Sequence, residues 1–338
     1  HGCLVGSEMC IRDSYYFFFT KHLIFTVLAI SIMMIISFIR TEVLIKLVIP
    51  AFVVSFIFLA MVPIIGVEAK GARRWLNLYF FNLQPVEILK PLFILMTVKI
   101  LTYKNFQNYH IKYLLSFILL SCVIILLIDQ PDLGQSILLT SSWIATVFVS
   151  GVSLIYIGIF LAIFLILFSS LLFFLPEKFG YIINRLISFF DPSQGDKFQS
   201  SSALDAIKLG GLTGQGMGEG ILKESVPEAH TDYVIAVISE EYGSIVSIII
   251  IAIFLYIAFR VIKSCFNQDN EFIKISLSGL ASLLIFQTFI HAGVNTNLLP
   301  TTGMTLPFLS YGGSSLMSSA ILAGLILNYT KNKTYLYD

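Results

Sequence analysis

The stretch "VLIKLVIPAFVVSFIFLAMVPIIG", residues 43–66, decides the class of fold, because Lys46 is its only charged residue. An apolar run of about 20 residues is long enough to cross the hydrocarbon core of a bilayer as a helix. The whole chain shares this character, since 57% of its 338 residues are hydrophobic and only 12% are charged. That composition is far from that of a soluble domain. The sequence therefore predicts an all-α, polytopic membrane protein.

Outward from this run, the rest of the chain repeats the same apolar pattern. Eight further stretches have the length and composition of membrane-spanning helices: 15–39, 84–102, 112–128, 133–151, 153–175, 233–259, 272–296 and 306–328. Basic residues gather in alternate short loops, which the positive-inside rule assigns to the cytoplasm. We therefore predict nine spans, a cytoplasmic tail at 331–338 and a long extracytoplasmic loop at 176–232.

Two further features of the composition bear on the domains and the partners. Residues 1–14, "HGCLVGSEMCIRDS", share no pattern with the rest of the chain and resemble a translated sequencing adapter, so we treat them as a non-native tail. Residues 15–330 are expected to form one membrane domain. The formal net charge of +1 provides no field that would attract a nucleic acid.

Polar segments interrupt the apolar pattern on the side that is predicted to face outward. The first is "EAKGARRWLN", residues 68–77, in which Arg73 and Arg74 precede Trp75. Arginine offers forked donors that suit phosphate, and tryptophan stacks on sugars or lies at the level of the lipid headgroups. The functional interpretation is a clamp for an anionic group. The alternative is an aromatic anchor beside basic residues that depart from the charge rule.

The next two segments carry buried charge on helices. In "QPVEILKP", residues 84–91, Glu87 and Lys90 share a helix face, so each offsets the charge of the other. Pro91 cannot donate to the carbonyl of Glu87, which leaves an acceptor free beside the pair. A purely structural ion pair that joins helices is as good an interpretation of Glu87 and Lys90 as a functional role. In "DQPDLGQS", residues 129–136, Asp132 precedes an apolar helix and is a candidate N-cap.

The segment "VPEAHTDYVIAVISEEYG", residues 226–243, opens on His230 and Asp232 and carries Glu240 and Glu241 within its apolar run. Small residues follow Asp232 along one predicted helix face, which would pack closely or line a wet groove. The structural alternatives are an N-cap for Asp232 and buried polar contacts for the two glutamates. The last segment, "LLPTTGMTLPFLSYGGSS" at 298–315, supplies glycines and hydroxyls for close backbone approach and hydrogen bonding.

Five stretches resemble, in this order, the signature segments of the SEDS family (shape, elongation, division and sporulation): "GARRWLNL", "QPVEILK", "DQPDLGQS", "PEAHTDYVIAVISEEYG" and "LPTTGMTLPFLSYGGSS". The segment "GGLTGQGMGEG" is more similar to division-type members than to elongation-type members. The resemblance implies a bundle of ten membrane helices, the first of which is missing here. It also implies a glycosyltransferase of the bacterial inner membrane at the division septum. Its outward-facing site would polymerise lipid II into peptidoglycan and release undecaprenyl diphosphate.

The resemblance also implies roles for individual residues. The family's catalytic aspartate matches Asp232, which would act as the general base and take a proton from the acceptor hydroxyl. Glu87 would orient Lys90, and Asp132 would shape the cavity. The residues expected to hold substrate phosphates are Arg73, Arg74 and Lys90, and the further candidates for substrate binding are Trp75, His230, Ser310, Gly312 and Ser314. The implied partners are a class B penicillin-binding protein and other divisome proteins.

The sequence leaves the cofactor and two other function classes open. Mg²⁺ characteristically combines one or two carboxylates with substrate phosphates, so a divalent cation is the candidate cofactor, although no dedicated metal cage is visible. A flippase or carrier for lipid-linked precursors would also place charges within the membrane, but it needs polar groups on both sides. A non-catalytic scaffold of the division machinery would not depend on Asp232.

Overall fold

The structure is a computed structural model that describes residues 15–69, 72–77, 82–104, 109–174 and 198–331, with gaps at 223–225 and 227 and isolated positions between 180 and 190. The predictions for residues 1–14, for most of 176–197 and for 332–338 lie outside the described residues. Within the described part helices dominate, and the predicted all-α membrane fold is confirmed.

The connections between elements are short in the first half of the chain and longer around α8, α9 and α12. The first half contains α1 (Tyr15–Phe38), α2 (Thr41–Ile65), β1 (Val67–Ala69), β2 (Ala72–Asn77), β3 (Asn82–Leu83), α3 (Pro85–Leu101), α4 (Tyr109–Asp129), α5 (Leu133–Val149) and α6 (Leu154–Phe174). The second half contains α8 (Phe198–Gly210), α9 (Val234–Tyr242), α10 (Ser244–Cys265), α11 (Glu271–Asn295) and α12 (Gly313–Thr330).

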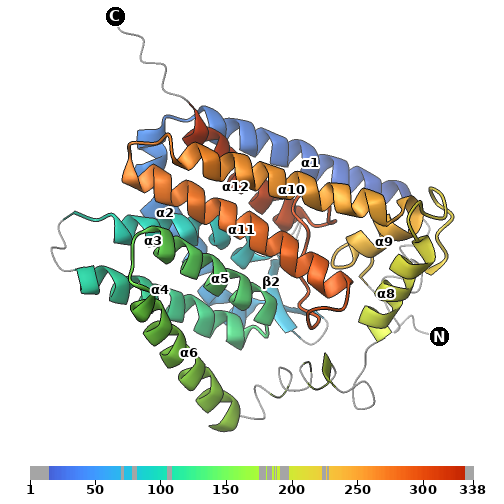
Figure 1. The fold of residues 1–338 in the computed structure, drawn as a ribbon, viewed down its shortest axis with the longest axis horizontal. Coiled ribbons are helices and arrows are strands. Elements are labelled where there is room, and N and C mark those ends of the chain that lie inside the picture. The colour runs from blue at the N-terminus through green and yellow to red at the C-terminus, as the bar shows by residue number, and fades with distance from the viewer. Residues whose placement is uncertain are drawn as a thin grey trace, which may run out of the picture.

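Helix α11 is the central helix of the bundle, where it packs against α5, α10 and α3 (Figure 1). In its most apolar window 67% of the residues are buried, against 22% for α10, which leaves α10 to face the lipid. Lipid chains are as apolar as leucine, so polar side chains gather inside such a bundle. Helix α11 is therefore the element best placed to carry buried polar groups.

A small antiparallel sheet follows α2 and sets the position of the arginine segment. Strand β1 pairs with β2, with Glu68 opposite Arg73, and β2 pairs with β3, with Leu76 opposite Leu83. Side chains alternate between the two faces of a strand, so Arg73 and Arg74 point to opposite sides of β2. The sheet thus turns one arginine toward the bundle and the other toward solvent.

The predicted span 233–259 is two helices, because the chain breaks at Gly243 between α9 and α10. Gly243 has φ +90°, a conformation that residues with a side chain rarely adopt. A Cβ there would lie 2.1 Å from the carbonyl oxygen of Leu212. The single span was wrong because the apolar pattern continues through the break and does not register the loop packed against it.

That loop, residues 210–216, supplies the hydrogen bonds that the break removes. The amides of Gln215 and Gly216 donate to the last carbonyls of α9, at 2.8 and 3.0 Å. The amide of Ser244, at the start of α10, donates to the carbonyl of Gly211 at 2.9 Å. Unpaired backbone groups are costly in an apolar medium, so this loop makes a broken helix tolerable there.

The predicted span 306–328 is also shorter than expected, since α12 begins only at Gly313. Residues 301–312 run as an irregular segment with turns at the foot of α12. Within the described part of the chain, five helices are long and apolar enough to cross a membrane: Phe19–Phe38 of α1, α2, α4, α10 and α11. The count of nine spans stays a prediction.

Candidate functional site

Glu87 and Lys90 form a buried ion pair at the start of α3, with 2.8 Å between Oε2 and Nζ. Both residues are almost inaccessible, at 2% and 1% exposure. Gln135 of α5 donates its amide to the other Glu87 oxygen at 2.8 Å, and Lys90 donates to Gln287 of α11 at 3.5 Å. The predicted pair is therefore confirmed, and it joins three helices in the interior of the bundle.

Ser318 of α12 satisfies the backbone acceptor that Pro91 leaves free. Its hydroxyl donates to the carbonyl of Glu87 at 2.6 Å. The sequence predicted the free carbonyl but not its partner, because that partner lies far along the chain. A fourth helix is thereby tied to the ion pair.

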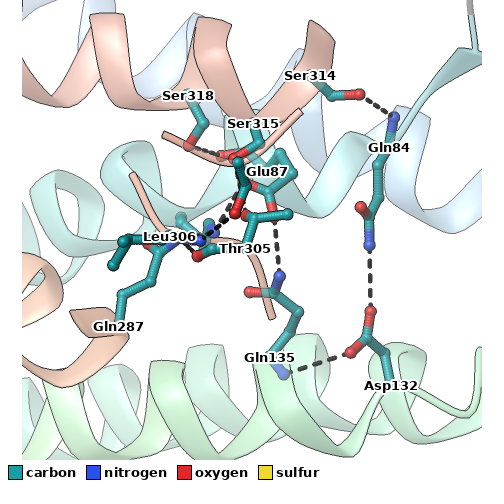
Figure 2. A network of polar contacts seen from close by, with 12 residues as sticks. Gln84, Glu87, Asp132, Gln135, Gln287, Thr305, Leu306, Ser314, Ser315 and Ser318 are labelled. Atoms are coloured by element: carbon teal, nitrogen blue, oxygen red, sulfur yellow. Dashed lines mark hydrogen bonds and ion pairs between the residues drawn. The ribbon is translucent and has the colours of Figure 1, made fainter. Parts of the chain in front are cut away.

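Asp132 caps helix α5, as predicted, by accepting from the amide of Gln135 at 3.3 Å. Its other carboxylate oxygen accepts from the side-chain amide of Gln84 at 3.2 Å. The backbone amide of Gln84 donates in turn to the hydroxyl of Ser314, at 3.3 Å. Figure 2 shows this chain of contacts beside the ion pair. Ser314 and Asp132, two of the candidate residues, thus belong to one network.

The two arginines of strand β2 differ sharply in their surroundings. The side chain of Arg73 is 55% exposed and pairs with Glu68 at 3.5 Å, at the surface. The side chain of Arg74 is 16% exposed and lies 4.0 Å from Asp132. Arg74 also donates to the backbone carbonyls of Gln130 and Pro131. The structure therefore brings Arg74, and not Arg73, into the network.

Asp232 lies in a turn that precedes α9, so it is not part of a helical face. The N-cap of α9 is Tyr233, so the alternative interpretation of Asp232 as an N-cap is wrong. The amide of Asp232 donates to the carbonyl of Glu228 at 3.0 Å, which closes the turn. The prediction that Asp232 shares a helix face with the small residues after it was wrong, because residues 228–233 form this turn before α9 begins.

Gly303 brings Asp232 and Arg74 together, although the three residues are far apart in sequence. A Cβ added at Gly303 would lie 3.4 Å from Oδ2 of Asp232 and 3.8 Å from Nη1 of Arg74. Gly303 itself has φ +67°. The absence of a side chain there keeps open a space that a carboxylate and a guanidinium both border.

The remaining candidates divide between internal contacts and exposed positions. The hydroxyl of Ser310 is buried, donates to the carbonyl of Thr231 at 2.6 Å and accepts from the amide of Leu306 at 2.8 Å. The amide of Tyr311 donates to the carbonyl of His230 at 2.9 Å, while the His230 side chain is exposed. These bonds join the turn that carries Asp232 to the segment before α12.

Gly312 and Trp75 lie at the edges of this arrangement. Gly312 is the N-cap of α12, and a Cβ there would meet Ser315 at an ordinary 3.5 Å. Close backbone approach therefore does not require a glycine at this position. Trp75 lies in β2 opposite Val67 and is half-buried.

The two acidic residues within the run have different surroundings. Glu240 is fully buried, and its carboxylate accepts from the amide of Leu222 at 2.7 Å. This is the buried polar contact that the sequence offered as one interpretation. Glu241 is half-buried, and its backbone carbonyl accepts from the amide of Gly216 at 3.0 Å.

Arg185 was missed by sequence reasoning, although a basic residue in a long outward loop is a usable signal. Its guanidinium donates to the carbonyl of Thr301 at 3.3 Å, two residues before Gly303.

Burial and the charge of Asp232 raise the pKa of Tyr233 above its usual range, and the charge of Arg185 opposes that rise. Burial raises the pKa of Asp132 as well, against the charge of Arg74. Two arginines, Arg185 and Arg74, and one carboxylate, Asp232, thus lie beside the segment 301–303.

The part of the chain that the structure describes contains no group of three or more His, Cys, Asp or Glu side chains that could hold a metal ion. A divalent cation at this site would take most of its ligands from phosphate oxygens and water. Asp232 is the carboxylate that borders the space at Gly303 and so could supply one protein ligand.

Taken together, the fold and the site define a class: a multi-pass membrane protein with a buried ion pair beside a space that a carboxylate and an arginine border. The model of the FtsW, RodA and SpoVE family, described as cell cycle proteins, matches residues 4–335, and the chain belongs to this family.

Named relatives lie within the same family. The chain is 36% identical over 279 residues to the probable peptidoglycan glycosyltransferase FtsW of Caulobacter vibrioides, covering 81% of this chain and 70% of that one. It is 33% identical over 339 residues to the corresponding protein of Coxiella burnetii, covering 96% of this chain and 90% of the relative. Both relatives are matched over most of their own length.

Solved structures agree with this assignment. The chain resembles one component of a peptidoglycan synthase complex that coordinates polymerization and crosslinking, with a TM-score of 0.77, 24% identity and coverage of 94% of this chain and 90% of that one. It also resembles a mutant of the rod shape determining protein RodA from Thermus thermophilus, with a TM-score of 0.65, 25% identity and coverage of 92% and 87%. The first of these likenesses concerns the fold alone.

Proposed function

We propose that this protein is a peptidoglycan glycosyltransferase that polymerises lipid II during septal wall synthesis. The observation that carries the proposal is the space at Gly303, which the carboxylate of Asp232 and the guanidinium of Arg74 both border. Transfer of a sugar from a lipid pyrophosphate needs a base for the acceptor hydroxyl and a cation for the departing phosphates. The names of the relatives support the same activity.

The proposed reaction is a single displacement with inversion at the anomeric carbon. The acceptor hydroxyl oxygen forms a bond to that carbon while its proton passes to Asp232. The bond between the carbon and the pyrophosphate oxygen breaks, and undecaprenyl diphosphate leaves with the electron pair. Asp232 is half-buried, so it can meet a substrate hydroxyl and still lie in a partly water-excluded place.

Among the basic candidates, the geometry favours Arg74 as the phosphate ligand. Lys90 is enclosed by Glu87 and Gln287 in the interior and is better suited to hold α3 against α11. Arg73 pairs with Glu68 at the surface and would meet only the periphery of a lipid headgroup. We propose that Arg185 assists Arg74, since its guanidinium donates to the carbonyl of Thr301 in the same segment.

The partner, the location and the cofactor belong to the same proposal. A class B penicillin-binding protein would cross-link the strands, and other divisome proteins would bring both enzymes to the septum. The site would face the periplasm, where the acceptor strands lie. A Mg²⁺ ion held by one carboxylate and the substrate pyrophosphate would neutralise charge on the leaving group.

The test is polymerisation of purified lipid II by the chain with a class B partner in detergent micelles. Asp232→Asn removes the base with little change in size, and Asp205→Asn is the matched control, because Asp205 is exposed on α8 and pairs with Lys208. We expect glycan strands from the wild type and from Asp205→Asn, and none from Asp232→Asn. Equal product from both variants would exclude Asp232 from the chemistry. A folded wild-type complex without product would favour the transport function.

A further inference from the structure

Three polar side chains of α11 form a ladder on one face of the central helix. Gln287, His291 and Asn295 are spaced four residues apart, so they project from the same side of the helix. Their exposed fractions are 4%, 0% and 0%. Fully buried polar groups need hydrogen-bond partners, and in a membrane bundle the alternatives to protein partners are few. The partners of these three side chains therefore indicate what the helix holds in place.

The first two residues of this ladder, Gln287 and His291, hold the segment that carries Gly303. The amide of Gln287 donates to the carbonyl of Thr305 at 2.9 Å. The ring nitrogen Nδ1 of His291 lies 2.7 Å from the carbonyl of Met304, and since a carbonyl only accepts, Nδ1 carries the proton. One wall of the space at Gly303 is thus fixed to α11.

Asn295, the third residue of this ladder, holds the turn that carries Asp232 on the other side of the space. The side-chain amide of Asn295 donates to the carbonyl of Asp232 at 3.0 Å and to the carbonyl of His291 at 2.8 Å. Its carbonyl oxygen accepts from the amide of Ala236, in the first turn of α9, at 3.0 Å. Asn295 thus binds the chain on both sides of the start of α9, through one amide hydrogen to Asp232 and through its oxygen to Ala236, while its other amide hydrogen is bonded within α11.

We propose that Asn295 is the positioning residue that fixes the carboxylate of Asp232 relative to Gly303 and Arg74. The inference rests on the proposed function, in which Asp232 is the base. Asn295 is fully buried and donates to the carbonyl of Asp232, so it acts through the backbone of that residue. His291, one turn earlier on α11, binds the segment that carries Gly303. One turn of α11 therefore sets the distance between that segment and the turn that carries Asp232.

The consequence for catalysis comes from the sensitivity of proton transfer to geometry. A displacement of about 1 Å at a reacting group lowers a rate by roughly 100-fold. Without the Asn295 bond, the turn at 228–233 loses a hydrogen bond to the central helix, while its local hydrogen bonds and its bonds to the segment before α12 remain. The turnover number should fall, while substrate binding, which depends on the cationic groups, changes little.

The chain offers a matched control in Asn328 of α12. This asparagine is also buried, at 2% exposure, and its amide donates to the carbonyls of Ile36, Ser37 and Ile39 at the end of α1. Its oxygen accepts from the hydroxyl of Thr41 at 3.0 Å. Substitution of either asparagine removes a similar set of buried bonds, but only Asn295 contacts Asp232.

The experiment compares Asn295→Asp and Asn295→Ala with Asn328→Asp and Asn328→Ala in lipid II polymerisation, measured with the partner present. We expect all four to lower Tm, and only the Asn295 variants to lower kcat, by roughly 10- to 100-fold at a KM within about twofold of wild type. A kcat for the Asn295 variants equal to that of the Asn328 variants overturns the inference.

A further variant covers the case in which both Asn295 substitutions prevent folding. Asn295→Gln keeps the amide and moves it by one methylene, so we expect a folded protein with reduced kcat. Wild-type kcat in Asn295→Gln would overturn the inference. If Asp232→Asn itself retains wild-type activity, the proposed function fails; if only the Asn295 variants do so, the proposed function stands and the positioning role fails.

Discussion

Arg74 Nε lies 4.0 Å from Asp132 Oδ2, and both side chains are largely buried. This pair joins strand β2 to the start of α5, because Asp132 is also the N-cap of that helix. Arg74, which borders the space at Gly303, is thus paired with Asp132, a carboxylate that also has a structural role as a helix cap. The charge and the cap of Asp132 can be separated by mutation.

Asp132→Ala should lower the free energy of unfolding by about 1 kcal/mol through loss of the N-cap, and further through the unpaired charge of Arg74. Asp132→Asn keeps an acceptor for the Gln135 amide, so it should be the more stable of the two variants. Thermal unfolding in detergent measures both. Equal losses of stability would show that the cap contributes nothing.

The buried ion pair predicts strongly non-additive effects. Either Glu87→Gln or Lys90→Met leaves one buried charge without its partner, which typically costs about 3–5 kcal/mol. The double variant has no unpaired charge and should be more stable than either single variant. A double-mutant cycle on the free energy of unfolding tests this. Additive losses would contradict the direct pairing seen at 2.8 Å.

Gly303→Ala should reduce polymerisation more than stability. The added methyl group would lie 3.4 Å from Asp232 Oδ2 and 3.8 Å from Arg74 Nη1, and φ +67° adds strain of about 1–2 kcal/mol. Gly151 is the matched control, since it has φ +90° and no atom within 4 Å of its added Cβ. We expect similar Tm losses from the two alanine variants and loss of activity only at Gly303. Full activity of Gly303→Ala would show that no substrate group occupies this space.

Gly243→Ala should be severely destabilising, because its Cβ would collide with the backbone of Leu212 at 2.1 Å. Gly211→Ala has a similar backbone strain, at φ +57°, but open space around it. Hydrogen exchange of residues 210–216 should therefore rise far more in Gly243→Ala than in Gly211→Ala. Similar exchange in the two variants would mean that the loop can move aside without cost.

The two arginines of β2 should differ in function. Arg73→Ala removes an exposed pair, which is worth about 0–1 kcal/mol, and should leave polymerisation nearly unchanged. Arg74→Ala should raise the KM for lipid II and lower kcat, since Arg74 is proposed to hold the phosphates. Equal effects of the two substitutions on lipid II polymerisation would contradict the proposal that Arg74, and not Arg73, holds the phosphates.

Features with a local cause were the ones that sequence reasoning predicted. The spacing of Glu87 and Lys90 predicted their pairing, and the position of Asp132 before an apolar run predicted an N-cap. Pro91 predicted a free carbonyl at Glu87. Each of these results from helix geometry within a few residues, so a single sequence is sufficient to predict it.

Features with a distant cause were missed. The break at Gly243 depends on a loop at 210–216, and the apolar pattern around it is continuous. The approach of Asp232 to Gly303 depends on α11, whose polar residues read as isolated exceptions in an apolar run. Contacts of this kind are set by the packing of whole helices, which periodicity alone does not report.

The ladder on α11 also bears on the order in which the protein becomes active during its synthesis. Arg74, Glu87, Asp132 and Asp232 all emerge from the ribosome before Asn295 and Gly303. A nascent chain that ends before α11 has inserted would hold the base on a turn without its anchor and without the facing wall. The site is therefore completed only when α11 and the segment that carries Gly303 have been added, and a product that terminates before them would lack it.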